Sequence, residues 1–129
     1  MRLKAVRECP RLNSTPLARV EIGSAKVVVE ADDIDERRWR FVFSPFQAVR
    51  VVTADCFETP GGLMLDPHTV VEVVDSPWIA ELRASLVRID QGASFMDRAH
   101  HYLLPAQDDF IEVVAWSVVC VPVSDGGAA

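Results

Sequence analysis

The sequence has no long hydrophobic segment, which argues against a membrane-spanning helix and a secretory leader. The longest apolar run, Val113 to Val123, is interrupted by Ser117 and Pro122 and is shorter than the about 20 residues that span a bilayer. The first residues alternate charged and apolar side chains and contain no apolar core of signal-peptide length. We therefore expect a cytoplasmic protein.

Cysteine and histidine are scarce, which argues against a disulfide framework and a metal centre. The three cysteines, Cys9, Cys56 and Cys120, include no Cys-x-x-Cys pair, and free thiols suit a reducing compartment. The three histidines are His68, His100 and His101. Adjacent strand residues point to opposite faces, so His100 and His101 would not share one metal ion. We expect no metal and no reactive thiol.

Motifs for cofactors and for serine nucleophiles are also missing. The chain has no Gly-x-Ser-x-Gly elbow, no phosphate-binding glycine loop and no dinucleotide fingerprint. Basic residues are outnumbered 13 to 19 by acidic ones, and a net charge of −6 repels nucleic acid and anionic membranes. The one basic cluster, Arg37-Arg38-Arg40, is flanked by acids. We expect no cofactor, no nucleic acid and no membrane partner.

What the chain does have is β-strands, and the clearest lie between Ala99 and Val123. Two apolar strands are joined there by a turn at Gln107-Asp108. The second strand is apolar on both faces, which is typical of a central strand. One face should carry Phe110, Val114, Trp116, Val118 and Cys120, and the other Ile111, Val113, Ala115, Val119 and Val121.

Further strands are expected before this hairpin. Residues 2–7 alternate as an edge strand would, and residues 17–22 and 25–31 form a hairpin whose two-residue turn, Gly23-Ser24, begins with φ > 0. Trp39, Phe41 and Phe43 give the next strand an aromatic face. Ser44-Pro45 should bend the chain before a separate strand over residues 46–57. Residues 63–65 and 69–74 are the remaining candidates.

One helix is predicted, over about residues 77–90. Ser76 is a favourable N-cap, Pro77 suits the first helical position, and Gly92 ends the pattern. The apolar stripe consists of Ile79, Leu82, Leu86 and Ile89. Such a stripe requires a sheet to cover it.

The predicted fold class is α+β and mostly β. We expect a curled antiparallel sheet or partly open barrel of about seven strands with the one helix packed on it. Residues 1–123 should form a single globular domain and residues 124–129 a frayed C-terminal tail.

The C-terminal part resembles small uncharacterised bacterial proteins that end in a similar hairpin. The resemblance rests on Ser76-x-Trp78-Ile79 opening a helix, then His101-Tyr102, Asp109 and Glu112-Val113-Val114-Ala115. It covers residues 72–118 and implies the hairpin and helix, with no activity to carry over.

The most unusual residue of the apolar strand is Glu112. If the hairpin turns at Gln107-Asp108, Leu103 faces Glu112 and His101 lies diagonally on the same face. An unpaired buried carboxylate is very costly, so we predict that Glu112 is buried and paired with His101 or Arg50. The pair is either an acid–base dyad or, as we favour, a structural pair that fixes strand register.

Two acidic stretches are the candidate partner-binding residues: Asp32, Asp33, Asp35 and Glu36 in one, Asp108 and Asp109 in the other. The first is followed by arginines, and we favour a solvated connection whose halves partly neutralise one another over a metal or phosphate site there.

The favoured function is protein–protein association without catalysis, as in an immunity- or antitoxin-like partner of a protein that is itself basic. The alternative is a small-molecule-binding or enzymatic barrel with His101, Glu112 and Arg50 in an internal pocket, walled by Trp39 and Trp116. A chain with strands at both ends also favours a homodimer, with a monomer as the other outcome.

Overall fold

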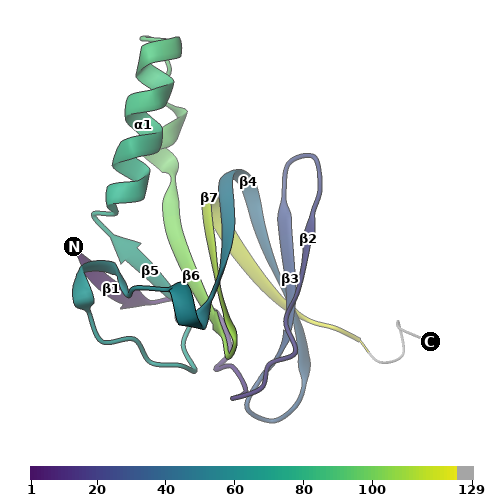
Figure 1. Ribbon diagram of the computed structural model, residues 1–129. Helices are drawn as coiled ribbons and strands as arrows, with labels where there is room; N and C mark the ends of the chain where they lie inside the picture. The colour runs from purple at the N-terminus through teal and green to yellow at the C-terminus, as the bar shows by residue number, and fades with distance from the viewer. Residues whose placement is uncertain (125–129) are drawn as a thin grey trace.

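The computed structural model describes residues 1–124, which form a seven-stranded sheet and one α-helix (Figure 1). The strands are β1 (Arg2–Ala5), β2 (Arg19–Ile22), β3 (Val27–Asp32), β4 (Arg38–Thr53), β5 (Val71–Val74), β6 (His100–Ala106) and β7 (Asp109–Pro122). The helix is α1 (Pro77–Ile89), and short 3-10 turns occupy Ala54–Cys56, Pro60–Gly62 and Phe95–Arg98. Of the expected C-terminal tail, residues 125–129 lie outside the described part.

The strands run in the order β1-β5-β6-β7-β4-β3-β2, and every neighbouring pair is antiparallel. The first and last strands of this order do not pair, so the sheet is curled but open. This confirms the predicted fold class. β7 is the middle strand, as its two apolar faces indicated.

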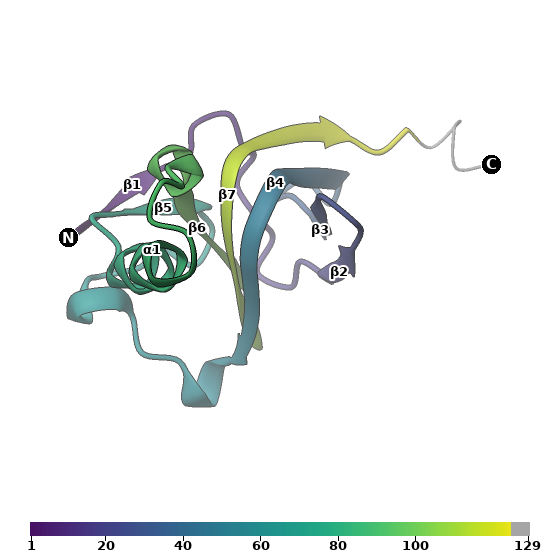
Figure 2. The same cartoon turned by 90° about the horizontal axis from the view of Figure 1, so that it is seen from above.

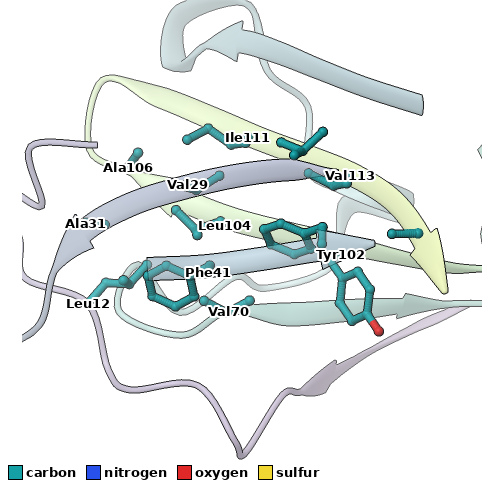
Figure 3. Packing of buried hydrophobic residues seen from close by; sticks show 13 residues of the cluster. Leu12, Val29, Ala31, Phe41, Val70, Tyr102, Leu104, Ala106, Ile111 and Val113 are labelled. Atoms are coloured by element: carbon teal, nitrogen blue, oxygen red, sulfur yellow. The ribbon is translucent and has the colours of Figure 1, made fainter. Parts of the chain in front are cut away.

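The sheet curls because its two longest strands, β4 and β7, bend together (Figure 2). Their register shifts between Phe46 and Ala48, and a bulge of this kind increases local twist. The curl brings β6 opposite β4, with the rings of Phe43 and Tyr102 5.4 Å apart. The main core therefore lies inside the curl and includes side chains of β3, β4, β6 and β7 (Figure 3).

The predicted faces of β7 are correct up to Ala115 and wrong beyond it. Ile111, Val113 and Ala115 share the core as expected, but Val118 and Cys120 also pack against it and Val119 is exposed. Beyond Ala115, β7 no longer pairs with β6, and its register with β4 shifts at the same point. A strict two-residue alternation does not survive this change of twist.

Three further expectations are wrong in detail. Residues 38–53 form one continuous strand. Pro45 lies beyond Phe43, the last residue of β4 that pairs with β3, so its missing N–H interrupts no hydrogen bond on that side. The β2–β3 loop spans residues 23–26, closed by a hydrogen bond from the Gly23 amide to the Lys26 carbonyl, and Gly23 has no positive φ. Residues 63–65 form no strand.

The helix begins and ends almost where predicted, but the sheet covers only part of it. The Ser76 hydroxyl oxygen caps α1 by accepting from the Ile79 amide at 3.3 Å. None of the helical residues is fully buried, Leu82 and Leu86 are half-buried, and Ile89 is 86% exposed. In Figure 1 the far end of α1 rises above the strands. Among the described residues, no helix is long and apolar enough to cross a membrane.

Candidate functional site

The carboxylate of Glu112 is buried and holds two partners from neighbouring strands. Its Oε1 accepts a hydrogen bond from Nε2 of His101 at 2.7 Å, and its Oε2 accepts from Nε of Arg50 at 2.6 Å. The side chains of Glu112 and His101 are 1% and 3% exposed. The hairpin register is the predicted one, with Leu103 opposite Glu112 and His101 opposite Val114. The prediction of a buried and paired Glu112 is confirmed, with both named partners present.

A third member of the network, Ser76, was not predicted. Its Oγ lies 2.7 Å from Nδ1 of His101. Because an ionised carboxylate only accepts, Nε2 of His101 carries a proton toward Glu112. In the neutral ring, Nδ1 then accepts the Ser76 hydroxyl proton, so a continuous hydrogen-bonded chain runs from the start of α1 through β6 to β7.

Trp78 and Arg50 cover the outer side of this network. The Arg50 guanidinium carbon lies 4.0 Å from the centre of the Trp78 ring, and the Trp78 ring meets His101 edge-on at 5.2 Å. Arg50 itself is 46% exposed. Burial alone would raise the pKa of Glu112, but hydrogen bonds and charge from His101 and Arg50 outweigh it and hold that pKa below its ordinary value. Glu112 is therefore ionised at neutral pH.

The geometry has the hydrogen bonds of a serine–histidine–carboxylate triad, with Ser76 on Nδ1 rather than Nε2. A hollow of about 400 Å³ borders Ser76. Two features favour a structural role all the same. The Ser76 oxygen already accepts from the helix, and the Glu112 charge is already matched by Arg50. The network joins the N-terminal end of α1 to the centre of the sheet.

The rest of α1 borders an apolar groove. Leu82 and Leu86 of the helix, Phe46 and Gln47 of β4, and Phe95 and Met96 line a space of about 380 Å³. Met96 is buried, whereas Phe95 is exposed. The sequence contained a sign of this groove: Phe95 and Met96 are apolar neighbours just after a helix with an apolar stripe.

The acidic stretch after β3 is largely occupied by its own chain. Oδ1 of Asp33 accepts from the amides of Asp35 and Arg37, and Oδ2 accepts from the Trp39 indole at 2.8 Å. Although its burial opposes the change, these hydrogen bonds lower the pKa of Asp33. Asp32 pairs with Arg38 at 3.1 Å and Asp35 with Arg37 at 3.7 Å. The arrangement matches the self-neutralising interpretation; Glu36 is exposed.

The remaining candidate residues lie apart from one another. Asp108 is exposed in the β6–β7 turn and Asp109 begins β7. Trp39, in β4, donates its indole N–H to Asp33 of the acidic loop, and Trp116 lines a different hollow, so the side chains of the barrel alternative do not line one pocket. Cys56 lies exposed in a 3-10 turn, not in the expected strand. Within residues 1–124, no three His, Cys, Asp or Glu side chains gather as metal ligands would.

Comparison with known proteins adds no further candidate. No protein-family model, no curated protein and no solved structure matches the chain. The resemblance of residues 72–118 to small bacterial proteins stays a prediction. The features from which a function can be argued are the network at the start of α1 and the groove beside the rest of the helix.

Proposed function

We propose that this protein acts by protein–protein association, as an immunity- or antitoxin-type partner, and that the groove beside α1 is its docking surface. The observation that carries the proposal is the apolar stripe that the sheet leaves half covered. Leu82, Leu86 and the exposed Phe95 line an open groove, and α1 has two further exposed apolar side chains, Val87 and Ile89. Exposed apolar surface of this kind favours association.

The buried network of Ser76, His101 and Glu112 positions the start of α1, which borders the groove, in the absence of a partner. Ser76, His101 and Glu112 hold the first turn of α1 on the sheet, and the groove is present in this partner-free structure. Less conformational entropy is then lost on binding.

The charge of the chain indicates the chemistry of the partner. A net charge of −6 attracts a basic protein and raises its association rate at low salt. Because Asp32, Asp33 and Asp35 already have partners within the chain, this charge acts mainly at long range. The contact itself is apolar: the proposed partner is a basic protein that inserts apolar side chains between α1 and β4.

The test compares capture by variants that differ in one exposed side chain. Phe95→Asp places a charge on the lining of the groove, and Ile89→Asp places one on the same helix face as Leu86. Met64→Asp does so at a residue that is 94% exposed in a loop outside the groove. Exposed substitutions change stability by at most about half a kcal/mol, so all three should fold. We expect a specific protein to be captured from the native host at low salt by the wild type and Met64→Asp. The groove variants should reduce its capture by about tenfold or more. Equal capture by all, or no capture at low salt, would refute the proposal.

Self-association is measured in the same series. Light scattering at micromolar concentration distinguishes one chain from two. A dimer that Phe95→Asp dissociates would mean that a second copy occupies the groove, which overturns the proposal of a different, basic partner.

The second candidate function is hydrolysis with Ser76 as the nucleophile. It is favoured by the two 2.7 Å hydrogen bonds of His101 and by the hollow that Ser76 borders. In such a reaction Ser76 Oγ attacks an ester carbonyl, His101 Nδ1 takes its proton and passes it to the departing alcohol, and water then releases the acyl group. A fluorophosphonate probe should label Ser76 in the wild type and not in His101→Gln. Absence of labelling in the folded protein excludes this candidate.

A further inference from the structure

A second surface feature, away from α1, is a hollow between the N-terminal segment and the end of β7. It has a volume of about 480 Å³ and is open on one side. The N-terminal segment contributes Lys4 to Glu8, and Tyr102 and Trp116 contribute aromatic rings from β6 and β7. Volumes of this size are typical of small-molecule sites.

Two polar groups of the aromatic rings have no partner within the described chain. Tyr102 is only 6% exposed, and its hydroxyl makes no hydrogen bond among residues 1–124. Figure 3 shows this hydroxyl pointing away from the core cluster. The indole Nε1 of Trp116 is buried without a partner, whereas the Tyr102 hydroxyl is not among the buried unpaired atoms. Nearly all buried polar groups in proteins are hydrogen-bonded, so the indole N–H of a residue that lines the hollow calls for an external acceptor.

The charged groups around the hollow leave donors in excess. Glu72 already accepts from Nδ1 of His100 at 2.8 Å. Lys4 and Arg7 make no ion pair within the described residues, although Lys4 lies opposite Glu72 in the register of β1 with β5. Glu8 makes no ion pair within these residues either. The unmatched groups are thus the Tyr102 hydroxyl, the indole N–H and two cations, against one carboxylate.

We propose that this hollow binds a small aromatic carboxylate. The carboxylate supplies the acceptors that the unmatched donors require, and the cations of the N-terminal segment neutralise its charge. The ring of Trp116, which also lies 4.8 Å from the Arg98 guanidinium carbon, provides the apolar wall that a planar ring packs against. This site is separate from the groove beside α1, and its occupancy does not depend on the proposed association.

The experiment titrates nitrogen-15-labelled protein with benzoate and follows the indole N–H resonances. Each tryptophan gives one resonance, and Trp116→Phe identifies the one that belongs to Trp116. Benzamide and benzylamine serve as matched neutral and cationic probes of the same shape. Tyr102→Phe removes only the hydroxyl, and because that group has no protein partner the variant should fold as well as the wild type. Arg7→Gln removes one cation, with Arg19→Gln, an exposed arginine of β2, as its control.

We expect benzoate to shift the Trp116 resonance saturably and to bind at least about tenfold more tightly than the other two probes. Tyr102→Phe should weaken benzoate binding several-fold, which is the usual effect of losing one hydrogen bond to a charged group. Arg7→Gln should weaken it too, while Arg19→Gln leaves it unchanged. An unmoved Trp116 resonance, equal binding of the three probes, or equal effects of the two arginine variants would overturn the proposal.

Discussion

Replacing Glu112 with alanine should destabilise the fold by about 3 kcal/mol, the lower end of the range for breaking a buried ion pair. The substitution leaves the buried His101 with an unpaired N–H, which costs about 1–3 kcal/mol, and leaves a space where the carboxylate was. Arg50 limits the loss because it is half-exposed and can be hydrated again. Glu112→Gln keeps the shape and one acceptor, so it should cost roughly half as much.

Thermal and urea unfolding of both variants measure the effect. For a chain of this length, about 3 kcal/mol corresponds to a fall in Tm of roughly 10–15 °C. Glu30→Ala is the matched control, since Glu30 also pairs with arginines of a neighbouring strand, Arg38 and Arg40, but its side chain is 23% exposed rather than 1%. Its loss should stay below about 1 kcal/mol.

The pattern of losses separates the possible roles of the network. A large loss for alanine and a smaller one for glutamine indicates a structural role. Glutamine that abolishes an activity with little change in Tm would make the role functional. Losses within about half a kcal/mol for both variants would refute the reasoning, since they would mean that Glu112 does not carry a buried pair.

Four further outcomes are expected. The lowered pKa of Glu112 means that its contribution is fully present above the unfolded value of about 4.3 and is lost as pH falls through its folded pKa, so Glu112→Gln should flatten the acid limb of a stability–pH curve. Ser76→Ala should cost about 1–3 kcal/mol in urea unfolding, because it removes a helix cap and leaves a buried imidazole nitrogen unpaired. Gln107→Gly should raise stability by up to about 1 kcal/mol, since φ is +66° there. In mass-spectrometric alkylation, the exposed Cys56 should react before Cys9, whose pKa is raised by a hydrogen bond to a neighbouring thiol and by burial.

Local rules were sufficient for much of the fold. The polar turn at Gln107-Asp108 determined the register of β6 on β7, and the cost of a lone buried carboxylate determined that Glu112 has a partner. N-capping by Ser76 placed the start of the helix to the residue. The alternation of acid and base after β3 likewise predicted a loop that neutralises itself.

What the sequence did not contain is the order of strands. Ser76 reaches His101 because β5 pairs with β6 and sets Val73 opposite His101, so the chain leaving β5 passes beside that ring. Nothing in the pattern of residues 69–76 requires that pairing. The same limit applies to the helix: an apolar stripe requires some cover, but its spacing does not say whether the cover is this sheet or another molecule.

Because α1 is joined to the sheet mainly at its first turn, it can open without the sheet unfolding. Amide hydrogens near its far end should then exchange with deuterium through local opening of the helix. Those in the middle of β4 and β7 should exchange only through global unfolding. A molecule seated in the groove binds only the closed helix, and it slows this exchange by the factor of one plus its concentration over its Kd. The rate of deuterium uptake in this single helix thus reports whether the groove is occupied, even when the bound molecule has not been identified.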